Sequence, residues 1–450
     1  MQAFSCFRRA RVLFVCLVFV SHLNVSARQN GSSPGNDALK SYVLQKDDSF
    51  SWKKGERKQV EGLTTVRLRL VSQTWRGHPW EHQMLIVRPA EARNADIGFL
   101  LISGDGDVSR SFDLLRTLAL RAGAAAAIVN NVPNQPLYDG REEDALIAFT
   151  FEQYVKSGDA TWPLLFPMVK SAVRAMDVLQ ALADKEFGGR INRFVVSGAS
   201  KRGWTTWLTG AVDPRVKAIA PMVIDMLNMK AQTEWAASMY GHQSEKVRDY
   251  TRYHFEERMD EPRVVELRNW VDPFSYRARY AMPKLLLLGT NDPYWVVDSL
   301  RHYWGELPEP KLVFQTPNAG HDLGGGHEAR PTLAAFYQMV ADRQPLPLMN
   351  WQFKTNSPDA AEIEVKLSTP AKFFRLWTAT SSDRDFRNEQ WSSHVLNSKP
   401  GSEVVTIVPR PPHGYRAYLV EAELTASTGH NFKLSTEARV IPDGPPEGTR

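Results

Sequence analysis

Cysteine is almost absent from this sequence, and the little there is lies near the amino end. The chain has two cysteines in 450 residues, Cys6 and Cys16. If the segment that holds them is removed, the remaining chain has no disulfide, no thiolate nucleophile and no cysteine-ligated metal. Such a protein depends on its apolar core for stability. This suits a large bacterial exported protein better than a small disulfide-stapled fold.

The sequence also lacks a dense run of basic residues. It contains 55 Lys and Arg against 50 Asp and Glu, and Arg8, Arg9 and Arg11 belong to the amino-terminal segment. Without these three, the count is 52 against 50, so the net charge is about +2. Nucleic acid or an acidic membrane is therefore not expected as the main partner.

No apolar run is long enough to span a bilayer comfortably. The longest, Val12–Val20, follows the basic residues and precedes a small-residue cleavage site that ends at Ala27. This pattern predicts a signal peptide over residues 1–27 and export to the periplasm or the medium, with no stable membrane anchor afterwards. A single membrane anchor is the alternative reading of the same run.

The remaining chain divides into three parts by pattern. Residues 28–40 are rich in Gly, Ser and Asn and predict a flexible leader. Residues 41–345 alternate short apolar runs with helical segments, which predicts an α/β fold with a doubly wound, mostly parallel sheet of about eight strands. Residues 346–450 show short strand-like runs between turn residues, which predicts a carboxy-terminal β-sandwich.

Two segments of the α/β part do not follow the alternation. A polar loop with Pro133 and Pro136 is expected to lead directly to a helix that begins near Pro163. Residues 225–281 are helical in pattern and rich in charge and aromatics, and they lie between two predicted central strands. Insertions at the carboxyl ends of strands lie over the site in open sheets, so we expect a cap here. A surface excursion is the alternative.

The strongest chemical signal is a strand, a tight turn and a helix around Ser200. The segment Ile191–Gly203 runs from an apolar strand into Gly198-Ala-Ser200 and then into a helix-compatible stretch. This arrangement is typical of the nucleophile elbow of α/β-hydrolases, which exposes the serine hydroxyl at a helix N-terminus. The usual G-x-S-x-G pattern is shifted here, because Arg202 occupies the place of the second glycine. An ordinary helix-capping serine is the alternative.

Candidates for the acid and the base follow in the order that this fold requires. Asp292 ends a buried leucine-rich strand and is placed to orient an imidazole, with Asp298 as the fallback acid. His321 lies in a loop after the next strand and is the candidate general base. An oxyanion hole is expected from the backbone N–H groups of Lys201 and of Asp105, which follows the strand over residues 97–102.

Further side chains are candidates for binding or for ion pairing. Trp204, Trp235, Trp295 and Asp225 are candidate substrate-binding residues, although large aromatics more often lie in the core. Arg202 is expected to pair with a carboxylate at the surface, and the acidic run 142–144 to be a solvated face. No metal and no cofactor are expected, because no histidine lies at ligand spacing from these carboxylates.

Four strings, taken together and in order, resemble the PhoPQ-activated pathogenicity-related proteins. They are GASKRGWT from Gly198, APMVIDMLNM from Ala220, GTNDPYW from Gly289 and GHD from Gly320, and the resemblance runs from about Tyr42 to the carboxyl end. It implies an exported α/β-hydrolase domain followed by a β-sandwich, with Ser200 as nucleophile, Asp292 as acid and His321 as base. The elbow also resembles that of glucuronoyl esterases.

These observations favour an exported serine esterase that acts on a small-molecule or glycan ester. The family includes slime-mould relatives that act as secreted growth repressors. A binding or signalling protein on a hydrolase fold, with the sandwich contacting a protein or glycan, is therefore an alternative. An aminopeptidase-like enzyme with the same triad is another, and it would need an acidic residue such as Glu234 or Glu256 near Ser200.

Overall fold

The computed structural model describes residues 37–187, 189–357, 359–397 and 399–446. The chain from Ala38 onward forms one compact unit. The predicted signal peptide and most of the predicted leader lie outside the described residues. Within those residues, no helix combines the length and the apolar composition needed to cross a bilayer.

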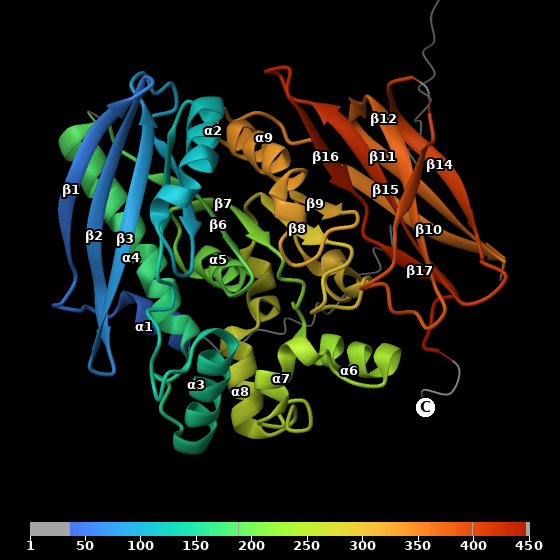
Figure 1. The fold of residues 1–450 in the computed structure, drawn as a ribbon, viewed down its shortest axis with the longest axis horizontal. Coiled ribbons are helices and arrows are strands. Elements are labelled where there is room, and N and C mark those ends of the chain that lie inside the picture. Colours follow the sequence, from blue (N-terminus) through green and yellow to red (C-terminus); the bar gives the residue numbers. More distant parts are fainter. Residues whose placement is uncertain (1–36, 188, 358, 398, 447–450) are drawn as a thin grey trace, which may run out of the picture. The chain divides into compact units, whose positions relative to one another are not determined.

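A nine-stranded sheet forms the centre of the fold (Figure 1). Its order is β1-β2-β3-β5-β4-β6-β7-β8-β9; β1, β2, β3 and β5 pair in antiparallel fashion, and the pairs from β5 through β4 to β9 are parallel. The strands are β1 (Ser51–Val60), β2 (Leu63–Trp75), β3 (His78–Pro89), β4 (Ile97–Ile102), β5 (Ala125–Val129), β6 (Arg193–Ala199), β7 (Val216–Met222), β8 (Lys284–Gly289) and β9 (Lys311–Thr316).

Helices cover both faces of this sheet, as its unbroken apolar strands require. All six residues of β4 are buried, because helices pack on both of its sides. On one face lie α2 (Phe112–Ala122) and α9 (Ala329–Ala341), which also contact each other. On the other face lie α4 (Leu165–Glu186) and α5 (Lys201–Val212), with α1 (Ala38–Leu44) packed on α4. The predicted doubly wound arrangement is confirmed.

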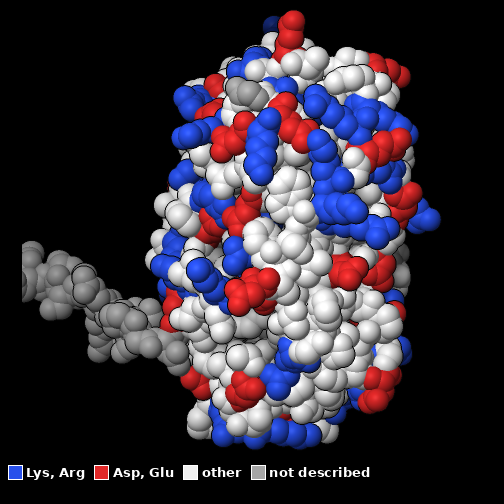
Figure 2. Space-filling model, turned by 90° about the vertical axis from the view of Figure 1, so that its left-hand side faces the viewer, with Lys and Arg blue, Asp and Glu red and all other residues white. Residues whose placement is uncertain are grey.

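The sheet has one strand more than the sequence predicts, and the unexpected strand is β1. Its sequence SWKKGERKQV has no apolar alternation, and most of its side chains are exposed, because β1 is an edge strand. Charged side chains on an edge strand oppose pairing with another chain. Figure 2 shows this side of the molecule, where Lys and Arg side chains are interspersed with Asp and Glu.

Two segments that the sequence predicts to be without regular structure form helices in the structure. The helix α3 (Glu143–Ser157) occupies part of the stretch that was expected to be a polar loop. Its burial is distributed widely round the helix, so it gives little amphipathic signal in the sequence. The predicted flexible leader ends too late, because residues 38–40 belong to α1. Leu39 and Val43 of this helix are buried in the core.

The predicted helical insertion is present between β7 and β8. It contains the helices α6 (Met229–Tyr240), α7 (Arg248–Thr251) and α8 (Pro262–Val271) and the 3₁₀ helices η2 (Glu245–Val247) and η3 (Pro273–Arg279). Gly241 ends α6 with a positive φ of 74°, a backbone conformation that glycine adopts without steric cost.

Two antiparallel sheets follow α9, as the sequence predicts. The first has the order β10-β11-β14, and the second has the order β13-β12-β15-β16 with β17 also paired to β15. Val365, Phe374 and Val420 are buried in a core that also includes residues of α9. The strands are β10 (Met349–Ser357), β11 (Ala360–Ala371), β12 (Phe373–Ser381), β13 (Ser392–Val395), β14 (Gly401–Pro409), β15 (Tyr415–Thr425), β16 (Asn431–Ser435) and β17 (Arg439–Ile441).

Candidate active site

Ser200 lies in a strained turn between β6 and α5. Its backbone has φ 56° and ψ −125°, a combination that is costly for a residue with a side chain. The Ser200 N–H donates to Met222 O at 2.9 Å, which ties the turn to the end of the neighbouring strand β7. A sharp strand-to-helix turn with a strained serine is the geometry of a nucleophile elbow.

Two glycines explain why the elbow tolerates an arginine at position 202. A Cβ on Gly198 would lie 2.6 Å from Arg202 O, and a Cβ on Gly203 would lie 2.9 Å from Met222 O. The close approaches of the turn therefore fall at Gly198 and Gly203. The shifted glycine pattern in the sequence is compatible with the elbow for this reason.

Asp292 and His321 are hydrogen-bonded to each other. His321 Nδ1 lies 2.8 Å from Asp292 Oδ2, and the Tyr294 N–H donates to Asp292 Oδ1 at 3.0 Å. The Asp292 side chain is 6% exposed and that of His321 is 25% exposed. The Tyr294 ring stacks on the imidazole with 4.2 Å between ring centroids. These contacts fix the orientation of the imidazole, as a general base requires.

The second nitrogen of His321 is left available. Nε2 is buried and has no hydrogen-bond partner within the described ranges. Ser200, Asp292 and His321 follow β6, β8 and β9, three strands of the parallel part of the sheet. Because parallel strands end at one edge of a sheet, the three side chains belong to the same edge.

Asp298, the fallback acid, has a different role. It accepts from Arg384 at 2.9 Å, from Arg301 at 3.0 Å and from the Trp235 indole at 3.0 Å. Although burial opposes it, Arg384 lowers the pKa of the Asp298 carboxyl below its ordinary value. Asp298 thus forms a buried ion pair with Arg384 and Arg301, to which Trp235 adds a hydrogen bond. The structure brings Asp292 to the imidazole.

The two expected oxyanion donors have different surroundings. Lys201 is the first residue of α5, so its N–H belongs to the unpaired first turn of the helix. Asp105 is exposed in the loop after β4, and no hydrogen bond from its N–H is found among the residues described. The Ser103 N–H, in contrast, donates to Val129 O at 2.9 Å.

Of the acidic run 142–144, only Glu142 is exposed as predicted, whereas Glu143 and Asp144 of α3 are paired inside the protein. Glu143 accepts two hydrogen bonds from the Arg202 guanidinium, at 2.6 and 2.7 Å. Asp144 accepts from Lys201 Nζ at 3.0 Å and from the Tyr250 hydroxyl at 2.9 Å. Although burial opposes it, the hydrogen bonds from Arg202 lower the pKa of Glu143 to about 2. The expected surface position of Arg202 is also wrong, because Arg202 is buried against Gly104.

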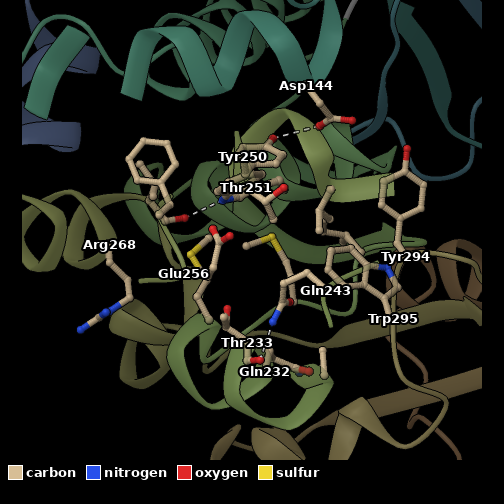
Figure 3. Close-up of a pocket in the computed structure, with 18 of the residues that line it drawn as sticks. Asp144, Gln232, Thr233, Gln243, Tyr250, Thr251, Glu256, Arg268, Tyr294 and Trp295 are labelled. Carbon is tan, nitrogen blue, oxygen red and sulfur yellow. Dashed lines mark hydrogen bonds between the residues drawn. The ribbon is translucent and has the colours of Figure 1, made fainter. Parts of the chain in front are cut away.

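A cavity opens beside Ser200, between the start of α5 and the helical insertion (Figure 3). Trp204 and Trp295, two of the predicted binding residues, line it. Asp225 and Trp235 lie elsewhere: Asp225 is buried and accepts from the Tyr303 hydroxyl at 2.6 Å. Burial raises the pKa of Asp225 to about 7. The insertion therefore lies at the site, as a cap would.

The described part of the chain contains no group of three or more His, Cys, Asp and Glu side chains that could hold a metal ion.

A segment of the carboxy-terminal sheets holds the two loops that carry Asp292 and His321. Asn291 Nδ2 donates to Phe386 O at 3.1 Å and to Glu389 O at 2.7 Å. Asn318 Nδ2 likewise donates to Trp391 O, and the Trp391 N–H donates back to Asn318 Oδ1. We call residues 382–391, between β12 and β13, the clamp segment. Sequence reasoning missed this contact, because these partners are more than 70 residues apart and share no period.

The comparisons with known proteins agree with this architecture. A family model described as PhoPQ-activated pathogenicity-related protein matches residues 39–387. The chain belongs to this family. Autocrine proliferation repressor protein A of Dictyostelium discoideum is 31% identical over 456 residues, covering 91% of this chain and 92% of that protein. The resemblance inferred from four strings of the sequence is confirmed.

Solved structures with a similar fold include two acetyl xylan esterases. Acetyl xylan esterase 1 from Thermoanaerobacterium sp. JW/SL YS485 is 13% identical with a TM-score of 0.49, covering 68% of this chain and 92% of that chain. The enzyme from Paenibacillus sp. R4 is 15% identical with a TM-score of 0.49, covering 69% and 93%. The chain itself has an α/β fold, with a large mostly parallel sheet and further antiparallel sheets at the carboxyl end.

Proposed function

We propose that this protein is a serine hydrolase that cleaves a carboxylic ester, with Ser200 as nucleophile, His321 as general base and Asp292 as the acid that orients it. The observation that carries the proposal is the 2.8 Å contact between His321 Nδ1 and Asp292 Oδ2, which leaves Nε2 without a partner among the described residues. The strained backbone of Ser200 supports it.

The reaction follows from the roles of these groups. His321 Nε2 takes the hydroxyl proton as Ser200 Oγ attacks the ester carbonyl, and Asp292 stabilises the imidazolium that forms. The N–H groups of Lys201 and Asp105 are proposed to hold the oxyanion. His321 then returns the proton to the leaving alcohol, and water activated by the same imidazole releases the acyl group.

A fluorophosphonate probe on the purified protein tests the nucleophile. We expect covalent labelling of Ser200, found by mass spectrometry of peptides, and loss of both labelling and ester hydrolysis in Ser200→Ala. The control is Ser238→Ala, which changes a serine of α6 outside the proposed triad. A folded wild-type protein that is never labelled and hydrolyses no short acyl ester, uronate ester or dipeptide amide contradicts the proposal.

A signalling protein without catalysis is the second candidate. It is favoured by the name of the 31% identical relative, an autocrine proliferation repressor, and the carboxy-terminal sheets would then contact a protein or glycan. The two candidates differ in the effect of Ser200→Ala. Unchanged biological activity of a folded Ser200→Ala protein favours signalling, and its loss favours hydrolysis.

An aminopeptidase-like reaction at the same triad is favoured by Glu256. This carboxylate lines the cavity that Ser200 lines, and it has no ion-pair or hydrogen-bond partner within the described part of the chain. Glu234 is exposed and pairs with Lys230 at 3.1 Å. Hydrolysis of dipeptide amides with a free amino group, and not of their acetylated forms, would support this reaction.

We also propose that the protein is exported, with cleavage near Ala27. The support is the basic, apolar and small-residue order of residues 1–27 in the sequence. Amino-terminal sequencing of protein recovered from the periplasm or the medium tests this proposal. A chain that keeps its first residues and stays in the cell contradicts it.

A further inference from the structure

The cavity beside Ser200 is built mainly by the insertion. One wall comes from α6 and another from α7 and α8, and the opposite side comes from α3, from α5 and from Tyr294 and Trp295 after β8 (Figure 3). Most of the lining is apolar. Its larger apolar side chains include Phe151, Trp204, Met226, Met229, Phe255 and Leu267.

Most of the polar groups in the wall already have partners inside the protein. Tyr250 donates to Asp144, and Gln243 donates to Thr233 O at 2.8 Å. Gln232 donates to Ser299 O at 3.0 Å. Arg268 donates to Met259 O at 2.8 Å, and Figure 3 shows its guanidinium pointing away from the hollow. The wall therefore offers few free donors for a hydroxyl-rich ligand such as a sugar.

The volume of the cavity suits a compact apolar group. It is about 190 Å³. An apolar cavity of about 150 Å³ is enough to hold benzene. Burying such a group stabilises the complex in proportion to the apolar surface removed from water. Methionine side chains, such as those of Met226 and Met229, adapt to ligands of differing shape.

We propose that this cavity binds an apolar group of the substrate, of about the size of a phenyl ring or a short alkyl chain, that is uncharged or cationic. This inference rests on the proposed function, because the group is attached to the ester that Ser200 attacks. The sign of charge follows from Glu256, whose carboxylate lies among the lining side chains opposite Tyr294 and Trp295 (Figure 3). A carboxylate in an apolar wall repels an anionic substituent and attracts a cationic one.

A bulky substitution in α6 tests the cavity, with a matched control on the same helix. Ala236 lines the cavity, whereas Ala237 is exposed. We expect Ala236→Phe to lower kcat/KM for hexanoyl and phenylacetyl esters at least tenfold, while kcat/KM for the acetyl ester stays within about twofold. Ala237→Phe should leave all three values unchanged.

The charge preference is tested with three esters of the same alcohol, whose acyl chains have the length of hexanoyl and end in a methyl, an ammonium or a carboxylate group. Wild-type protein should hydrolyse the carboxylate-ended ester at least tenfold less efficiently than the methyl-ended one, and Glu256→Gln should reduce that ratio. The proposal is overturned if kcat/KM is equal for all three esters. It is also overturned if the ratio of kcat/KM between the methyl-ended and carboxylate-ended esters is unchanged in Glu256→Gln.

Binding to Ser200→Ala separates this inference from the proposed function. The methyl-ended hexanoyl ester should bind Ser200→Ala in calorimetry and should not bind the double variant with Ala236→Phe. Binding without hydrolysis by wild-type protein upholds the cavity and overturns the catalytic proposal. Hydrolysis that is the same for acetyl and hexanoyl esters, and unaffected by Ala236→Phe, upholds catalysis and overturns the inference.

Discussion

Asn318 and Trp391 exchange two hydrogen bonds: Asn318 Nδ2 donates to Trp391 O at 3.0 Å, and the Trp391 N–H donates to Asn318 Oδ1 at 2.7 Å. Asn318 precedes His321 in the loop after β9, and Trp391 ends the clamp segment. The loop that carries the proposed base is therefore held by the carboxy-terminal sheets. Correct placement of an imidazole within a fraction of an ångström matters for the rate of proton transfer.

Removal of this contact should affect turnover more than substrate binding. We expect Asn318→Ala to lower kcat about 10- to 100-fold with KM near the wild-type value, because the His321 loop loses its anchor. Steady-state kinetics on a short acyl ester measure both constants. Asn192→Ala, which changes an exposed residue before β6, is the control. An unchanged kcat for Asn318→Ala would show that the anchor is dispensable.

The two aspartates after β8 should behave differently when changed to asparagine. Asp292→Asn should lower kcat by about 10⁴, because an amide no longer stabilises the imidazolium or fixes its tautomer. Asp298→Asn should instead lower the free energy of unfolding by about 3–5 kcal/mol, because Arg384 would be buried without its carboxylate partner. Kinetics and urea unfolding of both variants measure the two effects. The reverse pattern would make Asp298 the acid.

Gly203, which follows Arg202, should not tolerate replacement by alanine. Gly203→Ala places a Cβ 2.8 Å from Ile224 Cγ2 and 2.9 Å from Met222 O, so the elbow must shift. We expect a loss of about 1–3 kcal/mol in the free energy of unfolding and a lower kcat. Gly305→Ala is the matched control, because its Cβ meets nothing within 4 Å, and it should change stability by less than about 0.5 kcal/mol.

Asp225 should make the free energy of unfolding fall as pH rises. Its pKa is raised by burial from 3.8 to about 7, so between these values the folded protein keeps a proton that the unfolded chain releases. The free energy of unfolding then falls as pH rises from about 4 to 7, by about 1.4 kcal/mol for each unit of pKa difference.

Asp225→Asn cannot ionise, so it should become more stable relative to wild type as pH rises through this window. Urea unfolding at pH 5, 6, 7 and 8 measures the difference. Asp139→Asn changes an aspartate whose side chain is 92% exposed and should track wild type throughout. A difference between Asp225→Asn and wild type that does not vary with pH would show that Asp225 is ionised throughout.

The sheet and the order of the proposed triad were predictable because parallel strands leave a simple signature. Each buried strand is a short apolar run, and the residues that follow such runs meet at one edge. Ser200, Asp292 and His321 could be placed on this ground. The edge strand β1 could not, since a strand exposed on both faces shows no apolar pattern.

The contacts that surround the proposed triad could not be predicted, because they join polar side chains that are distant in sequence. Glu143 and Arg202 lie 59 residues apart, and Asp298 and Arg384 lie 86 apart. Their pairing depends on tertiary packing, and neither partner shows a pattern by itself. Trp235 was misassigned for the same reason, since its partner is Asp298 rather than a ligand.

The Arg384–Asp298 pair limits how the protein can be shortened. Both side chains are fully buried, and one comes from the clamp segment while the other comes from the α/β part. A truncation after residue 345 would remove Arg384 and leave Arg301 as the remaining cation that contacts the Asp298 carboxylate. It would also expose to water the apolar side of α9 that packs against the carboxy-terminal sheets. Expression of the α/β part by itself should therefore give insoluble material, and a trimmed form of this protein must retain the clamp segment and the strands that cover α9.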